Sequence, residues 1–216
     1  MHDALPSIID LTAYSIDLPL KEAFETAQGR KTYSPAVIIE MHLSDGGRGI
    51  GSATPLKYVT GEDIGSVLAA ARAVRDRLIG LGISDQQGIF SALLETIPNA
   101  HSARAGIEIA VVDAYCKFQS ISMHGFFGGA SDFVETDITI PITSPENARK
   151  LAHDAAERGF RSLKLKVGSK DAYEDKARVI AISEGAPNCL IRLDANQGFT
   201  PNAAVRFVEQ VVKAGS

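Results

Sequence analysis

The spacing of hydrophobic residues changes twice along this chain of 216 residues. Short alternating runs come first, residues 64–118 then repeat apolar positions at helical spacing, and strand-like and helix-like runs alternate after Gly128 and Gly129. We therefore expect a small sheet with helices in the first part. The second part is expected to be a parallel α/β arrangement.

Three short alternating runs predict strands in the first part, over residues 8–15, 37–43 and 49–53. The residues between the last two runs, Ser44 to Gly47, tolerate the positive φ angles of hairpin turns, so these strands are expected to form a hairpin. Polar and turn residues around an isolated Phe24 predict a loop over residues 17–34. A second loop is expected over residues 54–61.

Two segments carry an apolar stripe with the spacing of a helix. The members of the two stripes are Ile64, Val67, Leu68, Ala71, Val74 and Leu78, followed by Ala103, Ile107, Ala110, Val111, Ala114 and Phe118. Two or three helices are therefore expected to pack on the small sheet.

The second part reads as three strands, each followed by a helix. The predicted strands cover residues 138–142, 163–167 and 190–194, and the predicted helices cover 145–159, 171–183 and 201–212. Ser144 with Pro145 and Thr200 with Pro201 are typical N-cap and first-turn pairs. Strands separated by helices indicate a parallel sheet, either open or closed into a barrel. No glycine-rich phosphate motif follows a strand, which disfavours the nucleotide-binding versions of such sheets.

Two lysines alternate with apolar residues in the second of these strands. Lys164 and Lys166 share one face, because successive side chains of a strand point to opposite faces. In a parallel barrel, catalysis takes place at the carboxyl ends of the strands, and both Lys166 and Asp194 stand at such ends. The competing interpretation is that the lysines face solvent and that Asp194 begins a turn.

Composition and charge exclude several classes of protein. The net charge of −4 and the scattered basic residues give no footprint for nucleic acid. No run of about 20 apolar residues predicts a membrane span, and the first 15 residues do not resemble a signal peptide, so a soluble cytoplasmic protein is expected. Cys116 and Cys189 lack a CxxC motif, and the five histidines lack the spacing of metal ligands.

The order of these features resembles the enolase superfamily, specifically its muconate-lactonizing subgroup. The likeness is strongest to dipeptide epimerases such as the L-Ala-D/L-Glu epimerases. It rests on Thr54–Pro55, on VTGE at 59–62, on TDIT at 136–139, on KLKVG at 164–168 and on DANQG at 194–198, which begins 28 residues after Lys166. The resemblance implies an α+β capping domain over residues 1–130. An incomplete (β/α) barrel of the TIM type, with about three parallel βα units, is implied over residues 131–216.

The resemblance also implies a chemistry. Members of this family remove the proton next to a carboxylate, and Mg²⁺ stabilises the enolate that forms. Lys166 would be the general base, Lys164 its electrostatic neighbour, Asp194 a direct magnesium ligand and Asn196 a support for the metal or its water. A base must be neutral, and desolvation, a second ammonium group and a nearby cation all disfavour the charged form of a lysine.

Thr139, on the first barrel strand, matches a position that contacts substrate in this family. Four more candidates for substrate binding lie in the two cap loops that, by resemblance, close over the active site and select the substrate: Phe24 and Thr26 in the first loop, and Tyr58 and Thr60 in the second. The expected substrate is a small carboxylate such as a dipeptide. A packing role is the competing interpretation for each residue. Muconate cycloisomerase and o-succinylbenzoate synthase share the KxK strand and the metal site, so they are alternative activities.

Length sets this chain apart from the family pattern. A closed barrel usually takes about 250 residues, whereas residues 134–216 number 83 and supply three units of eight. The second and third carboxylate ligands of Mg²⁺ and the second lysine base would belong to later strands and are not present in this chain. We therefore expect the chain alone to be inactive. A missing C-terminal half, another copy of the chain in a homo-oligomer, or partial disorder are the alternatives for the open sheet. The alternative function is that of a non-catalytic assembly fragment.

Overall fold

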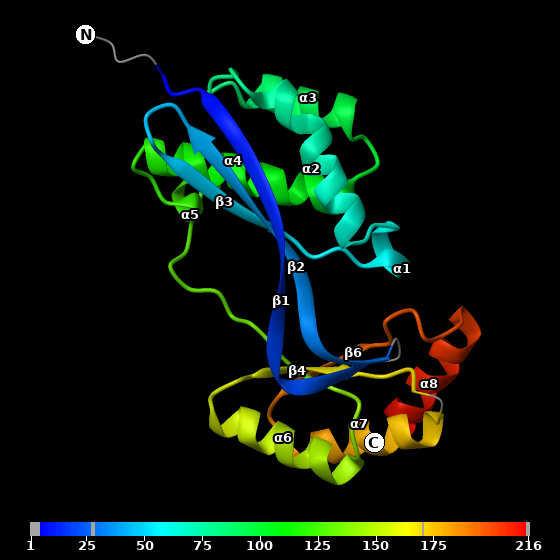
Figure 1. Cartoon of the computed structure of the whole chain (residues 1–216). Coiled ribbons are helices and arrows are strands. Elements are labelled where there is room, and N and C mark those ends of the chain that lie inside the picture. Colours follow the sequence, from blue (N-terminus) through cyan, green and yellow to red (C-terminus); the bar gives the residue numbers. More distant parts are fainter. Residues whose placement is uncertain (1–4, 27–28, 170, 215–216) are drawn as a thin grey trace. The chain divides into compact units, whose positions relative to one another are not determined.

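The computed structural model describes residues 5–26, 29–169 and 171–214 (Figure 1). The chain forms two compact units. The first consists of Met1–Pro19 and Tyr33–Asp132, and the second of Leu20–Thr32 and Phe133–Ser216.

A three-stranded sheet is the centre of the first unit. Its strands are β1 (Ile8–Thr26), β2 (Gly29–Leu43) and β3 (Arg48–Ala53), in the order β1-β2-β3. The strands β2 and β3 pair antiparallel, from Val37 opposite Ala53 to His42 opposite Arg48. The predicted hairpin around Ser44 to Gly47 is therefore confirmed.

The loop predicted over residues 17–34 is wrong, because β1 and β2 continue through it and pair with each other. Backbone hydrogen bonds between two chain segments stabilise a ladder that local side-chain alternation does not reveal. Pro19 lacks an N–H group, but it lies in β1, which is an edge strand of this sheet and tolerates the missing donor. The loop predicted over residues 54–61 contains one short helix, α1 (Lys57–Thr60), which ends at Gly61 with φ 77°.

Helices cover one face of this sheet. They are α2 (Ile64–Leu78), α3 (Gln86–Thr96) and α4 (His101–Phe118), followed by the short α5 (Met123–Phe126). Both predicted stripes are confirmed: the members of each are buried or partly buried in one apolar core with Ile39 and Met41 of β2. Burial of this apolar surface stabilises the unit.

The helix α4 packs directly on the backbone of β3. A side chain at Gly51 would overlap the carbonyl oxygen of Gly106, and one at Gly49 would overlap that of Ala110. Close contact of this kind needs residues without a Cβ atom, so these glycines determine how near the helix approaches the sheet.

Three parallel strands form the sheet of the second unit. They are β4 (Ile138–Ile140), β5 (Ser162–Lys166) and β6 (Leu190–Asp194), in the order β4-β5-β6. The strands alternate with α6 (Pro145–Glu157), α7 (Ala172–Gly185) and α8 (Pro201–Ala214), so the predicted βα units are confirmed. The strand β4 ends before Pro141 and is shorter than predicted, because proline cannot donate to a ladder.

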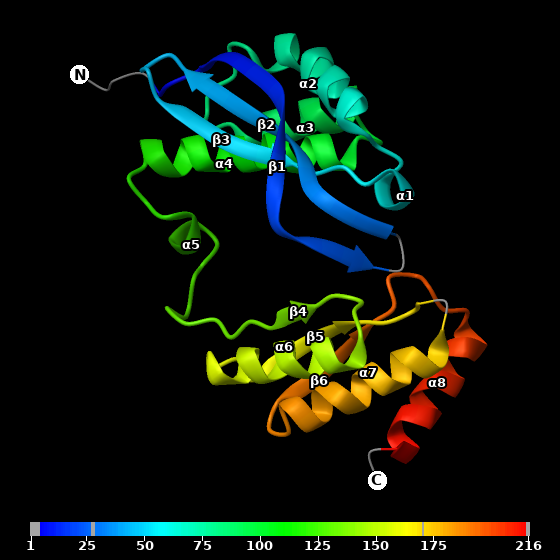
Figure 2. The ribbon, with the colours of Figure 1, turned by 60° about the horizontal axis from the view of Figure 1, so that its bottom comes forward.

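The helices α6 and α7 lie side by side on one face of this sheet (Figure 2). Alanines of α6 and Val179 and Ile182 of α7 pack against Leu163 and Leu165 of β5. The opposite face of β5 therefore carries the intervening polar residues. The candidate site is therefore on the face of β5 that does not pack on the helices.

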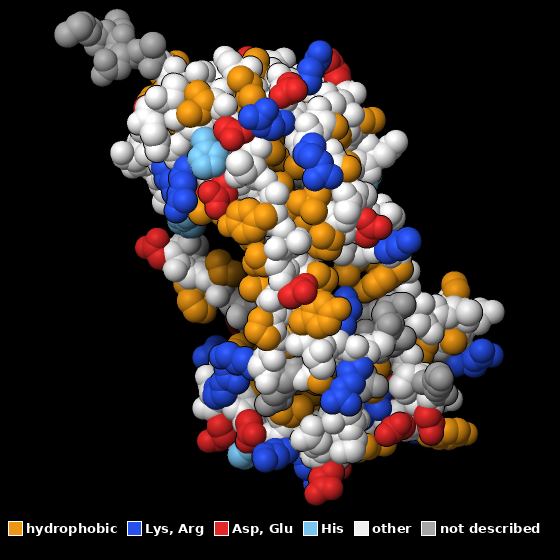
Figure 3. Space-filling model, in the orientation of Figure 1, with side chains coloured by type: hydrophobic (Ala, Val, Ile, Leu, Met, Phe, Trp, Pro, Cys, Tyr) orange, Lys and Arg blue, Asp and Glu red, His pale blue; other side chains and the backbone are white. Residues whose placement is uncertain are grey.

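Two surface properties bear on partners. Basic and acidic side chains are interspersed on the face drawn in Figure 3. Among the helices that the structure describes, none is both long and apolar enough to cross a bilayer.

Candidate active site

The two lysines of β5 stand on the sheet face away from the helices. Their neighbours Leu163, Leu165 and Val167 are fully buried against α6 and α7. In the sheet register, Lys164 lies between Thr139 of β4 and Arg192 of β6, and Lys166 lies opposite Asp194. Because register partners of parallel strands share a face, these residues form a polar row across the sheet.

Both lysine side chains converge on one carboxylate oxygen. The Nζ atom of Lys166 lies 2.8 Å from Oδ2 of Asp194, and that of Lys164 lies 3.0 Å from the same oxygen. The Lys166 side chain is only 10% exposed and that of Lys164 is 36% exposed. The ammonium groups therefore meet at the strand ends and are not directed into bulk water.

The second oxygen of Asp194 is held by the following turn. The backbone N–H of Asn196 donates to Oδ1 at 2.9 Å. Asn196 and Gln197 have φ angles of 46° and 65°, and asparagine tolerates this left-handed conformation better than most residues. The predicted Asn196 thus contacts Asp194 through its backbone.

These contacts act on the ionisation of Asp194. The hydrogen bond from Lys166 is the largest influence, and with those from Asn196 and Lys164 it outweighs burial, so the pKa of the carboxyl is held well below its usual range. Asp194 is accordingly a carboxylate at neutral pH. It is the counter-ion of both lysines.

A second ion pair on the same face was not predicted from the sequence. The Nη1 atom of Arg192 lies 3.3 Å from Oδ2 of Asp137. The two residues are 55 positions apart, and only the order of the strands brings them together. The row therefore contains three cationic side chains and two carboxylates.

The predicted substrate residues fall in different places. Phe24 and Thr139 line one cavity of about 340 Å³ in the second unit, together with Pro141 and residues of α6. Thr26 ends β1, but its side chain is outside what the structure describes. Tyr58 and Thr60 belong to α1 of the first unit, where Tyr58 is half exposed and Thr60 Oγ1 lies 3.3 Å from Ser102 Oγ.

Donors for a magnesium ion are few at this site. Mg²⁺ prefers six oxygen ligands in octahedral geometry. Within the described ranges no group of three or more acidic, histidine or cysteine residues is arranged to hold a metal. Asp194 has ion pairs or hydrogen bonds at both oxygens. These residues therefore do not fit a magnesium site by themselves, and Asp194 could supply only one of its ligands.

The arrangement is suited to chemistry on an acidic carbon. A lysine amine at a strand end can accept a proton, and a neighbouring ammonium group stabilises negative charge that develops on the substrate. The limited exposure of Lys166 strengthens such electrostatic effects. Proton transfer next to a carboxylate or carbonyl group is therefore the reaction that these side chains favour.

Two family models match this chain. Residues 8–128 match the N-terminal domain of the mandelate racemase/muconate lactonizing enzymes, and residues 147–215 match the enolase C-terminal domain-like model. The chain is 38% identical over 202 residues to an L-Ala-D/L-amino acid epimerase of Populus trichocarpa. That alignment covers 93% of this chain and 48% of the relative.

Two solved structures are also similar to the chain. A substrate-liganded complex of the L-Ala-D/L-Glu epimerase from Bacillus subtilis gives a TM-score of 0.91 at 30% identity, covering 97% of this chain and 59% of that one. A dipeptide epimerase of Enterococcus faecalis V583, complexed with Mg and the dipeptide L-Leu-L-Tyr, gives 0.90 at 30% identity, covering 96% and 59%. This chain thus spans about half to three-fifths of the length of these relatives.

Proposed function

Because the chain belongs to the mandelate racemase/muconate lactonizing enzyme family, we propose that it provides the capping domain and the first barrel units of a magnesium-dependent dipeptide epimerase. Its fold is that of the family: an α+β capping domain followed by an incomplete (β/α) barrel of the TIM type. We place the division at residues 1–130 and 131–216. The reacting groups then belong to the second part.

The proposed reaction is the removal of a proton from the α-carbon of a dipeptide residue. In its neutral form, after the proton held in its ion pair with Asp194 has been lost, Lys166 accepts this proton on one face of the carbon, and the electron pair of the C–H bond passes into the adjoining carbonyl to give an enolate. Lys164 stabilises the negative charge through its ammonium group. Inversion then requires a proton donor on the opposite face, the second lysine that the family resemblance assigns to a later barrel strand of the whole enzyme.

One observation carries this proposal: two lysines on one strand converge on the carboxylate that ends the next strand. The Nζ–Oδ2 distances of 2.8 and 3.0 Å bring three charged groups together at the carboxyl ends of parallel strands. Reacting residues occupy such strand ends in parallel barrels. Thr139, the register partner of Lys164, is a proposed substrate contact. Phe24 is proposed as a second one; the cavity that it shares with Thr139 is bordered by α6, and Lys164, Lys166 and Asp194 are not among its lining residues.

Magnesium is part of the proposal because a structural relative contains it and because Asp194 could bind it. The Enterococcus faecalis relative is complexed with Mg, and a divalent cation would stabilise an enolate oxygen. Asp194 would supply one ligand. Because the described donors do not form a magnesium site by themselves, we expect this chain alone to bind Mg²⁺ weakly and to have no measurable turnover.

The test is exchange of the substrate α-proton with deuterated solvent. The part of the Bacillus subtilis epimerase outside the matched region can be fused to the C-terminus of this chain or added to it as a separate polypeptide. L-Ala-L-Glu, L-Leu-L-Tyr and D-Ala-L-Val are then incubated with Mg²⁺, and deuterium at each α-carbon is followed by NMR. We expect incorporation into at least one dipeptide. No incorporation into any of them would refute the proposed function.

Variants assign the base. Lys166→Ala should lower the exchange rate by about 100-fold or more, the usual contribution of a general base. Lys150→Ala is the matched control, because Lys150 is an exposed lysine of α6 and its loss should leave the rate unchanged. Exchange that persists in Lys166→Ala at the control rate would remove Lys166 from its proposed role.

A further inference from the structure

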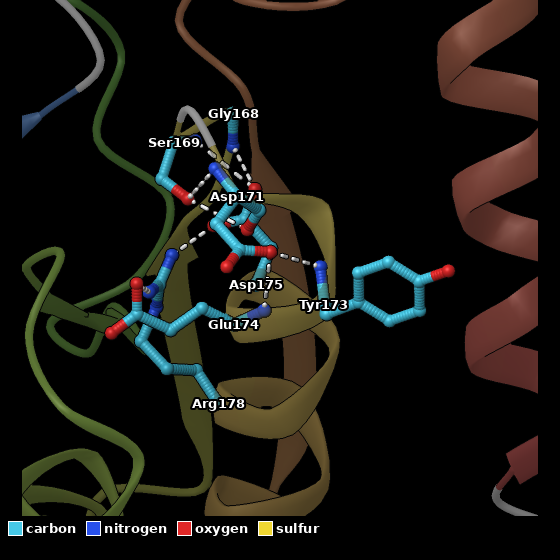
Figure 4. A network of polar contacts seen from close by, with 7 residues as sticks. All are labelled: Gly168, Ser169, Asp171, Tyr173, Glu174, Asp175 and Arg178. Atoms are coloured by element: carbon cyan, nitrogen blue, oxygen red, sulfur yellow. Dashed lines mark hydrogen bonds and ion pairs between the residues drawn. The ribbon is translucent and has the colours of Figure 1, made fainter.

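A fully buried ion pair lies beneath the strand end that carries Lys166. The carboxylate of Asp175 and the guanidinium of Arg178 both come from the first turns of α7 and have no exposed surface. Arg178 Nη2 donates to Asp175 Oδ1, and Arg178 Nη1 lies 3.9 Å from Glu174 Oε2 (Figure 4). Burial of two charges is costly, and the pair offsets this cost only in part, because in the described part of the chain Arg178 Nε and Nη1 are buried without a hydrogen-bond partner.

The second oxygen of Asp175 binds the loop that follows β5. The backbone N–H groups of Gly168 and Ser169 both donate to Asp175 Oδ2, at 2.8 and 3.0 Å (Figure 4). Successive backbone N–H groups make a concave site for an anion, and here the carboxylate of the next helix fills it. Asp175 thus fixes the backbone two and three residues after Lys166.

The same loop contacts the turn that follows Asp194. Gly168 has a φ of 91°, and a side chain at this position would come within 3.0 Å of the Ala195 carbonyl oxygen and 3.4 Å of Gly198 Cα. The backbone N–H of Val167 donates to the carbonyl oxygen of Asp194 at 3.0 Å. The position of residues 167–169 therefore determines how the end of β5 meets the end of β6.

We propose that Asp175, held by Arg178, is a positioning residue that sets the distance between Lys166 and Asp194. It acts on the loop backbone, through the hydrogen bonds to Gly168 and Ser169. The inference rests on the proposed function, because the distance matters to catalysis only if Lys166 is the base. The geometric part can be tested without substrate.

The experiment follows the Lys166 ammonium group by NMR on the full 216-residue chain. An ammonium group held in an ion pair exchanges its hydrogens slowly with water and gives a resolved ¹⁵Nζ signal, which Lys166→Arg would assign. In Asp175→Asn the loop loses its anion, so we expect the Lys166 hydrogens to exchange about tenfold faster or the signal to disappear. Glu184→Gln is the matched control, since Glu184 is an exposed acid near the other end of α7 that pairs with Arg149 and not with the buried pair, and it should leave the signal unchanged.

A second variant covers the case in which Asp175→Asn does not fold. Gly168→Ala disturbs the same loop through its positive φ and its contact with Ala195, yet leaves the buried pair intact. It should also speed the exchange of the Lys166 hydrogens with water or remove the Lys166 signal. An unchanged Lys166 signal in folded Asp175→Asn would overturn the proposal, as would an unchanged signal in Gly168→Ala where Asp175→Asn cannot be folded.

The two proposals fail separately. If the substrate exchanges its α-proton for deuterium but the Lys166 signal is the same in Asp175→Asn as in wild type, only the positioning role is refuted. An Lys166 signal that responds to Asp175→Asn, in a protein that never exchanges a substrate α-proton, refutes the proposed function alone and leaves Asp175 as the residue that sets the geometry of the ion pair.

Discussion

Lys166 and Asp194 are paired in the strand register, and their side chains also form an ion pair. Their Cα atoms face each other across the parallel ladder of β5 and β6, and the Lys166 Nζ atom lies 2.8 Å from Asp194 Oδ2. A slip of one residue between these strands would send Asp194 to the face that packs on the helices. The register that buries Leu163 and Leu165 therefore also assembles the candidate site.

From this ion pair we predict that the protein loses stability in acid. Folding lowers the pKa of Asp194 below its ordinary value of about 3.9, mainly through the hydrogen bond from Lys166. The stabilisation is therefore present above this ordinary value and is lost as the pH falls toward the lower pKa of the folded state. We expect the free energy of unfolding to fall by about 1–2 kcal/mol between about pH 5 and about pH 2 through this group.

Urea unfolding, followed by circular dichroism at several pH values, measures this contribution. Asp194→Asn should flatten the pH dependence. Asp154→Asn, at an exposed position of α6 in the same unit, should keep the wild-type slope. Identical slopes in wild type and Asp194→Asn would contradict the prediction.

Glu62 is expected to stabilise the start of α4. Ala100 provides no side-chain cap there, and Glu62 accepts hydrogen bonds from the backbone N–H groups of Ser102 and Ala103 at 2.7 and 3.2 Å. Burial raises the pKa of Glu62, but these hydrogen bonds outweigh it and the net pKa is lowered. Glu62→Gln should cost about 1–2 kcal/mol of unfolding free energy at neutral pH.

The loss should shrink in acid, because the wild-type carboxyl contributes its charge above its ordinary pKa and loses that contribution as the pH falls through the lowered value. Glu95→Gln is the control: its side chain is largely exposed on α3, and its removal should change stability by less than about 0.5 kcal/mol. Equal stability of Glu62→Gln and wild type at neutral pH would show that Glu62 does not cap the helix.

Gly51 is expected to tolerate no side chain. A Cβ atom there would overlap the Gly106 carbonyl oxygen and approach the Ala110 nitrogen to 2.8 Å, and both are backbone atoms that cannot move aside alone. Gly51→Ala should therefore destabilise the first unit by about 3 kcal/mol or more. The control, Gly65→Ala, is in the first turn of α2, where a Cβ atom would meet only Asp63 Oδ1, at an ordinary contact distance of 3.4 Å, and should be neutral or stabilising by up to about 1 kcal/mol. Thermal unfolding separates the two outcomes.

Local patterns predicted most of the second unit, because each βα unit is specified by neighbouring residues. The alternation in β5 separates Leu163 and Leu165 from Lys164 and Lys166, and the structure keeps that separation. The caps of the helices follow in the same way: Ser144 accepts from the Asn147 N–H, as its position before Pro145 indicates. Such features need no knowledge of distant segments.

Features that depend on distant segments were missed. The loop predicted over residues 17–34 is paired strand, because β2 supplies the hydrogen bonds to β1. The ion pair of Arg192 with Asp137 requires the strand order, and the burial of Asp175 requires a loop folded onto α7. An acid and an arginine three positions apart usually indicate an exposed helix face, so no local pattern predicts that Asp175 and Arg178 are buried.

The sheet of the second unit is expected to drive self-association. Its order is β4-β5-β6, so within the described part of the chain β6 is an edge strand, and Leu190 of that strand is 71% exposed. An edge strand presents backbone N–H and C=O groups that can pair with another chain, and an exposed leucine adds apolar surface to that contact. We therefore expect the average mass in solution to exceed the 23.0 kDa of one chain and to rise with concentration.

Leu190→Lys should reduce this association, because a charge on an edge strand opposes pairing with a second copy. The matched control is Leu94→Lys: Leu94 is also exposed, but it lies on α3 of the first unit and belongs to no sheet edge. Light scattering coupled to size-exclusion chromatography, over about a tenfold range of concentration, measures the mass of each variant. A wild-type mass that stays at that of a single chain would contradict the prediction. An equal decrease of mass in both variants would show that exposed leucines in general cause the association, because only a specific effect of Leu190→Lys locates the contact at β6.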